Sequence, residues 1–181
     1  MTAPRAPNSV GTHSASGPVA RLLAADHARL DALLGRATSQ PGNIDGGAYA
    51  EFRSGLLKHI GMEEKMLLPA AQRARGGTPL PIAARLRLDH GALAALLVPT
   101  PTPAIIAALR RILAAHNAVE EGPDGVYEVC EQLVGDDAEA LLAQLRAAPD
   151  VPVHAHVDGP RIMDATRRAL ARAGYSLDEA E

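Results

Sequence analysis

Apolar residues recur every three or four positions along most of the chain, the spacing that is typical of amphipathic helices. The first such segment covers about residues 16–36, where Ser16 offers a capping side chain and Pro18 suits the first helical turn. Its apolar stripe consists of Val19, Leu22, Leu23, Leu30 and Leu34. We therefore expect a first helix that buries one face.

The same periodicity predicts further helices, and turn-forming residues separate them. They cover about residues 47–74, 81–98 and 103–121, resume over 126–133 after a Gly-Pro-Asp-Gly interruption, and continue over 136–147 and from about 160. Helical segments joined by short turns are typical of bundles. The predicted fold is therefore all-α: an up-down-up-down four-helix bundle with an additional short helix and a C-terminal extension helix.

This pattern divides the chain into three regions. Residues 1–15 are small, polar and proline-bearing, so we expect a disordered N-terminal tail. Residues 16–149 form the predicted bundle. Residues 150–181 form a C-terminal extension, in which an extended segment with the alternating sequence VPVHAHV precedes a helix.

Some polar residues fall on the apolar stripes. His27 lies on the stripe of the first helix, and His59 and Glu63 lie on that of the second, beside Phe52 and Leu56. A buried carboxylate without a partner is costly, so a compensating group is expected nearby. A single histidine on an apolar helix face is usually structural. A functional interpretation is favoured here only because the pattern recurs.

Two short strings occur twice in the chain. DHARLDALL at 26–34 matches DHGALAALL at 89–97, and HIGMEE at 59–64 matches HNAVEE at 116–121. The order is thus a helix with one histidine, then a helix with His-x-x-x-Glu, and then the same pair again. This order predicts two related helix pairs around a local two-fold axis, with four histidines and two glutamates meeting in the middle.

The spacing of these residues indicates metal binding. Residues i and i+4 share a helix face, so a histidine and a glutamate at that spacing can reach the same metal or two adjacent metals. Imidazole suits iron, zinc and copper, while a carboxylate can bridge a metal pair. Two metals would then use four terminal imidazoles and two bridging carboxylates. The candidate ligands are His27, His59, Glu63, His90, His116 and Glu120.

Composition narrows the class of protein. The apolar content is 47%, with one Phe and no Trp, which suits closely packed helices rather than sheets. A net charge of -3 argues against nucleic-acid or membrane-surface binding. The single cysteine fits a reducing compartment, and no apolar run is long enough for a signal core or a membrane span. We expect a soluble cytoplasmic protein that is a monomer or a weak homo-oligomer.

At the six candidate ligands the chain resembles the hemerythrin-like, or HHE cation-binding, family. The resemblance covers about residues 16–135 and fills every position of the motif. It implies a non-haem centre of two iron ions bridged by oxide or hydroxide, in which the four histidines bind terminally and the two glutamates bridge. It also implies binding of, or reaction with, a small ligand: dioxygen, nitric oxide or peroxide.

The chain departs from the oxygen-carrying members of that family at one position. These have a further histidine four residues after the one in the third helix, where this chain has Ala94. The resemblance then implies an additional open position on one iron. That favours reactivity with peroxide or nitric oxide, or sensing, over reversible oxygen carriage.

Other functions remain open from the residues themselves. Iron storage or sensing without turnover would use the same ligands. A ferritin-like carboxylate oxidase would need four carboxylates and two histidines, which is the reverse of this set. A zinc or manganese site is compatible with the ligand types.

Residues next to the candidate ligands are of two kinds. Asp26 and Asp89 precede the lone histidines, and either orient a ligating imidazole or lie exposed on the helix. Glu64 and Glu121 follow the proposed bridging residues, and we expect each to be a solvated flank or a hydrogen-bond partner of a ligating histidine.

We expect the remaining candidates to have structural roles or to face solvent. Tyr127, like Tyr49 and Tyr175, is expected to be a packing residue, and Cys130 a small core residue. His154 and His156 would face the same way from an extended segment. They either cover the open end of the site, bind a second metal or, as we favour, face solvent.

Overall fold

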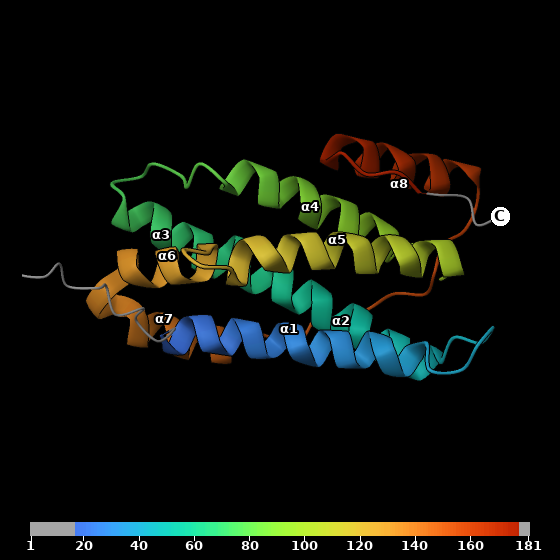
Figure 1. The fold of residues 1–181 in the computed structure, drawn as a ribbon, viewed down its shortest axis with the longest axis horizontal. Helices are drawn as coiled ribbons and strands as arrows, with labels where there is room; N and C mark the ends of the chain where they lie inside the picture. Colours follow the sequence, from blue (N-terminus) through green and yellow to red (C-terminus); the bar gives the residue numbers. More distant parts are fainter. Residues whose placement is uncertain (1–16, 178–181) are drawn as a thin grey trace, which may run out of the picture.

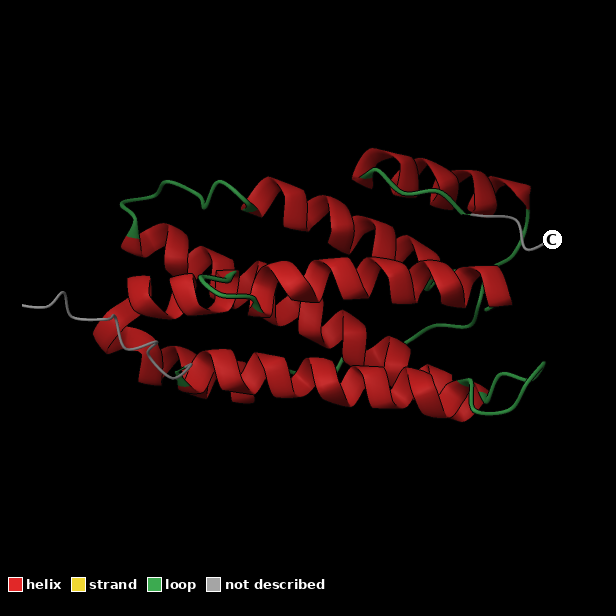
Figure 2. Ribbon diagram, in the orientation of Figure 1, coloured by secondary structure: helices red, strands yellow, loops and turns green. Residues whose placement is uncertain are grey.

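A computed structural model describes residues 17–177, and these residues form helices and connecting loops without a strand (Figures 1 and 2). The elements in chain order are α1 (Pro18–Ala37), α2 (Gly46–Met62), η1 (Glu63–Leu67), α3 (Leu68–Ala74), α4 (Ala83–Leu96), α5 (Pro103–Glu121), α6 (Val126–Val134), η2 (Gly135–Asp137), α7 (Ala138–Arg146) and α8 (Pro160–Ala173). The all-α class is thus confirmed for the described residues. The predicted tail at 1–15 lies outside them.

The long helices α1, α2, α4 and α5 lie along the long axis of the molecule (Figure 1). Helix α1 packs against α2, and α4 packs against α5, which are the two helix pairs that the repeated strings predict. Helices α1 and α5 also contact each other. The up-down-up-down order of these helices stays a prediction. None of the described helices is long and apolar enough to cross a membrane.

The start of α1 differs from the prediction. Gly17 occupies the N-cap position and supplies no side-chain cap, while Ser16, the expected cap, lies outside the described residues. Instead, the backbone N–H groups of Val19 and Ala20 donate to the carboxylate of Glu131, at 2.9 and 3.1 Å. A carboxylate at a helix N-terminus satisfies free N–H donors and complements the helix dipole. This contact holds the N-terminal end of α1 against α6.

The second predicted helix, over 47–74, is divided into α2, η1 and α3. The segment η1 is a π-helix, in which the N–H of Leu68 donates to the carbonyl of Glu63 five residues earlier. Single π turns inside α-helices occur frequently at functional sites. Pro69, which has no N–H to donate, follows directly in the first turn of α3. The change of helix type therefore coincides with a proposed bridging glutamate.

The apolar core consists of two clusters. One contains Leu30 and Leu93, and the other contains Leu23 and Leu86. His27 lies between Leu23 and Leu30 in α1, and the equivalent histidine of α4 lies between Leu86 and Leu93. The candidate ligands therefore form a polar layer across the bundle, with a hydrophobic cluster on either side.

The predicted C-terminal helix is present as α8. Residues 150–159 have no helix or strand, and α8 packs against α4. Thr166 in α8 donates its hydroxyl to the carbonyl of Ala95, and Leu170 is fully buried in the first cluster. The apolar face of α8 is thus part of the core of the bundle.

Candidate metal centre

The structure brings all six sequence-predicted ligands together in the polar layer, and every one of these side chains is buried. Their ligand atoms form two groups in which the members lie within 4.8 Å of one another. The first group is His27, His59, Glu63 and Glu120, and the second is Glu63, His90, His116 and Glu120. Both glutamates therefore belong to both groups, which is the arrangement that bridging carboxylates require.

Glu63 lies between histidines from the two halves of the bundle. Its Oε1 is 3.2 Å from Nε2 of His59, which is one turn earlier in the same helix. Its Oε2 is 3.1 Å from Nε2 of His90 in α4. The two oxygens of one carboxylate thus face imidazoles of different groups.

Glu120 repeats this arrangement with the roles of the halves exchanged. Its Oε1 is 3.2 Å from Nε2 of His116, again one turn earlier in the same helix. Its Oε2 is 3.5 Å from Nε2 of His27 in α1. The contacts of the two glutamates are consistent with the local two-fold axis that the sequence repeat predicts.

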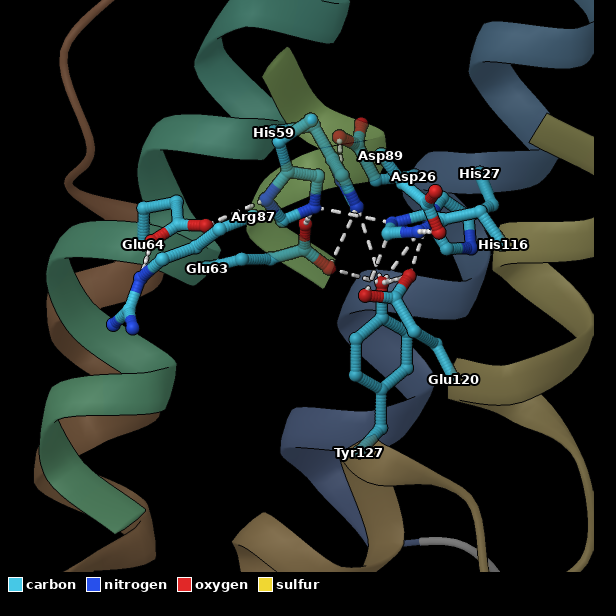
Figure 3. A network of polar contacts seen from close by, with 11 residues as sticks. Asp26, His27, His59, Glu63, Glu64, Arg87, Asp89, His116, Glu120 and Tyr127 are labelled. Atoms are coloured by element: carbon cyan, nitrogen blue, oxygen red, sulfur yellow. Dashed lines mark hydrogen bonds and ion pairs between the residues drawn. The ribbon is translucent and has the colours of Figure 1, made fainter. Parts of the chain in front are cut away.

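In the first group, the second ring nitrogen of each histidine meets a carboxylate. Nδ1 of His27 is 2.5 Å from Oε1 of Glu121. Nδ1 of His59 is 2.9 Å from Oδ2 of Asp26, and both of these residues are labelled in Figure 3. Metal-ligating histidines usually donate the other ring N–H to a carboxylate, which fixes the tautomer and the ring orientation. Here that donation leaves Nε2 directed toward the shared glutamates.

In the second group the partners are Glu64 and Asp89. Nδ1 of His90 is 2.7 Å from Oε1 of Glu64, whereas Nδ1 of His116 lies 3.5 Å from Oδ2 of Asp89 without forming a hydrogen bond. The sequence alternatives are therefore settled for Asp26, Glu64 and Glu121, which hydrogen-bond to candidate ligands. Asp89 contacts one at a longer distance.

Several features of the polar layer fit a cation. Oε2 of Glu63 is buried and makes no hydrogen bond, although Nε2 of His90 lies 3.1 Å away. The Nε2 atoms of His90 and His116 face each other at 3.1 Å. Buried polar atoms without a hydrogen-bond partner need an explanation, and a shared cation satisfies both the carboxylate and the imidazoles. The residues present therefore fit a metal pair.

The buried ionisable groups of the polar layer shift one another's pKa values. Burial, with the nearby Glu63 carboxylate, raises the pKa of Glu120. Burial opposes ionisation of Glu63 as well, but the neighbouring His59 and His90 outweigh it and hold the pKa of Glu63 well below its usual value.

The pKa values of the two imidazoles of the first group shift in opposite directions. Burial alone would lower the pKa of His59, but Glu63 and Asp26 raise it to about 10. Burial and the adjacent His59 lower the pKa of His27 to about 4. The raised pKa of His59 and the lowered pKa of Glu63 thus reflect the mutual stabilisation of their opposite charges.

Tyr127 is the residue of the site that the sequence analysis missed. Its hydroxyl donates to Oε1 of Glu63 at 2.5 Å and lies 3.0 Å from Nε2 of His27 and 3.1 Å from Nε2 of His59. It is also 3.0 Å from Oε2 of Glu120 (Figure 3). The expectation that Tyr127 only packs is therefore wrong. Burial, Glu63 and Glu120 raise its pKa well above the usual value.

The turn between α5 and α6 places Tyr127. Asp124 has a φ of 55°, and a Cβ on Gly125 would lie 2.4 Å from the carbonyl oxygen of Glu120. Only glycine permits so close an approach of the chain to itself. The turn therefore lies tightly against the end of α5, and α6 begins directly after it. The Gly-Pro-Asp-Gly string directly after HNAVEE was the available signal, because it predicts an interruption between the ligand-bearing helix and the next one.

The other sequence candidates lie outside the two groups. His154 is exposed, and its carbonyl accepts a hydrogen bond from Arg53. His156 is half-buried and stacks on Tyr49. Cys130 is fully buried in the second cluster, as expected, and burial raises the pKa of its thiol to about 12.

A small cavity connects the polar layer with the surface. Its volume is about 180 Å³, and its lining includes Glu120, Glu121 and Tyr127 together with residues of the first turns of α1. The cavity is large enough for a diatomic molecule or peroxide. It approaches the site from the side of the first group.

Comparison with known proteins gives no matching family model, no matching curated protein and no matching solved structure. What the structure shows is an all-helical protein with buried histidine and glutamate clusters that could hold metal ions.

Proposed function

We propose that this chain is a non-haem di-iron protein of hemerythrin-like type that binds or reacts with a small ligand, namely dioxygen, nitric oxide or peroxide. The single observation that carries the proposal is that two groups of four buried ligand atoms share both glutamates. Unrelated surface histidines and carboxylates do not form such a pair of groups inside a hydrophobic core.

The donor set favours iron. Four imidazole nitrogens with two shared carboxylates are softer than the all-oxygen sets that magnesium and calcium prefer. Each group supplies four protein ligand atoms from these six residues, and iron accepts up to about six. Positions for a small exogenous ligand therefore remain. When bound, the iron pair supplies electron transfer to or from that ligand.

The chain itself has three tasks in this proposal. The hydrophobic clusters on either side of the polar layer exclude water. Asp26, Glu64 and Glu121 hold the imidazoles with Nε2 directed inward. Glu121 and Tyr127 line the cavity through which a small ligand would reach the site.

The test is an absorption spectrum of the protein loaded with iron, taken before and after addition of peroxide or of nitric oxide. We expect near-ultraviolet bands of a coupled iron pair that change on addition, together with consumption of the added reagent. Iron binding without any spectral response would favour storage or sensing. A protein that binds no iron would contradict the proposal.

A further inference from the structure

Tyr127 occupies a special place relative to the first ligand group. Its oxygen lies 3.0 Å from Nε2 of His27, 3.1 Å from Nε2 of His59 and 3.0 Å from Oε2 of Glu120. The fourth member, Glu63, is closer still at 2.5 Å. One oxygen is thus in contact with a ligand atom of every member of the first group.

These distances match those between neighbouring donor atoms on one metal ion. Nitrogen and oxygen donors bind such metals at about 2.0–2.1 Å, so two donors at right angles are about 3 Å apart. A phenolic hydroxyl can donate one hydrogen bond and accept two. Donation to Glu63 together with the contacts to both imidazoles uses that capacity in full, so the contact with Glu120 is one more than hydrogen bonding accounts for.

The second group lacks such an oxygen. The Nε2 atoms of His90 and His116 face each other at 3.1 Å, and no described tyrosine hydroxyl contacts either ring. The tyrosine comes from α6, which begins after the turn at Gly125 and is fixed to the start of α1 through Glu131. The surrounding fold therefore holds the ring in place on one side of the site only (Figure 3).

We propose that Tyr127 is a fifth protein ligand, through its phenolic oxygen, of the metal held by His27 and His59. The proposal rests on the two-metal function proposed above. Coordination replaces the phenolic proton with the metal, and the proton leaves to solvent. The anionic oxygen adds one negative charge to the first position, so the two metals become inequivalent although their histidines and glutamates are equivalent.

The experiment uses the full-length chain loaded with iron(II) under anaerobic conditions and then oxidised in air. A phenolate bound to iron(III) gives a charge-transfer band in the visible region and enhanced tyrosine vibrations in the resonance Raman spectrum. We expect both signals in the natural protein. We expect Tyr127→Phe to lose both and to keep most of its iron, because four ligand atoms remain.

Tyr49→Phe is the matched control. Tyr49 is also a buried tyrosine, its hydroxyl has no hydrogen-bond partner, and it belongs to the core cluster that does not contain Tyr127. This variant should keep the visible band. The natural protein grown with ring-deuterated tyrosine provides a test without a variant, because the enhanced vibrations must shift if the ligand is a tyrosine.

The outcomes separate the two proposals. Iron-loaded protein without a phenolate band, or a band that persists unchanged in Tyr127→Phe, would overturn the tyrosine ligand and leave the iron pair intact. A chain that binds no iron would overturn both. A visible band that is lost in Tyr127→Phe and retained in Tyr49→Phe would support the ligand.

Discussion

The two ligand groups are built from the same residue types but have different surroundings. In the first, His27 and His59 meet the hydroxyl of Tyr127. In the second, the Nε2 atoms of His90 and His116 face each other at 3.1 Å instead. The candidate ligands come from the repeated strings, whereas Tyr127 comes from α6, which lies outside the repeat. Equivalent residues in an approximate two-fold arrangement therefore have different surroundings in the two groups.

The two aspartates show the same divergence. Asp26 hydrogen-bonds to His59 at 2.9 Å and also accepts from Arg29, three residues later. Asp89 is bound by Arg85, four residues earlier, and reaches only to 3.5 Å from its histidine. Neither arginine has a counterpart in the other half, because Arg29 corresponds to Ala92 and Arg85 to Leu22. The arginines therefore direct otherwise equivalent carboxylates differently.

The largest effect is expected from replacing a glutamate that both groups share. Glu63→Ala should abolish binding at both positions, because it removes a ligand from each. Metal ions at about 1,000 times their Kd would stabilise the natural protein by about 4 kcal/mol, and this stabilisation should be missing in the variant. Metal content and thermal unfolding with and without iron measure it. Glu51→Ala, on the exposed face of the same helix, is the control and should behave like the natural protein.

Replacing one histidine should remove the metal from only one of the two groups. His90→Ala should lose the second metal and keep the first, because the first group retains all its ligands. His27→Ala should do the reverse. Iron per chain would fall to about half in both variants, and only His90→Ala should retain the phenolate band. Equal spectra for the two variants would show that the groups do not differ as the structure indicates.

The turn before α6 should affect the first group selectively. Gly125→Ala places a Cβ 2.4 Å from the carbonyl oxygen of Glu120, so the turn must shift and Tyr127 with it. Overpacking of this kind costs about 1–3 kcal/mol. Chemical denaturation measures the loss of stability, and the phenolate band reports the displacement. Gly91→Ala in α4, where a Cβ would meet nothing within 4 Å, should not lower the stability and should leave the phenolate band unchanged.

The smallest effects should come from the carboxylates that orient the histidines. Asp26→Asn should weaken iron binding by about 10–100-fold without changing the number of metals bound at saturation. Asp89→Asn should weaken it less, because Asp89 makes no hydrogen bond to His116. Competition with a chelator measures both affinities. An equal or larger loss for Asp89→Asn would contradict the difference between the aspartates.

The clustering of the six candidate ligands could be predicted from the sequence, because each of them occurs twice at the same place in a repeated string. His27 is ambiguous alone, but His90 in the matching string removes the ambiguity. The choice of Glu63 over Glu64 for the inward position followed from helix periodicity, and the structure places Glu63 in the layer and Glu64 against an imidazole.

Tyr127 could not be found in the same way, because nothing in the other half corresponds to it. Its position depends on the tight turn at Gly125 and on the packing of α6 against α1, which are tertiary features that no local period encodes. The π-helical segment after Met62 is similar in this respect. A sequence pattern with a period near 3.6 cannot distinguish it from the α-helix on either side.

The central claim is that two metals share Glu63 and Glu120. Anomalous X-ray diffraction at the iron absorption edge, from crystals of the iron-loaded protein, tests it most directly. We predict two anomalous peaks, one beside His27 and His59 and the other beside His90 and His116, with each glutamate in contact with both. A single peak, or peaks away from the polar layer, would contradict this account.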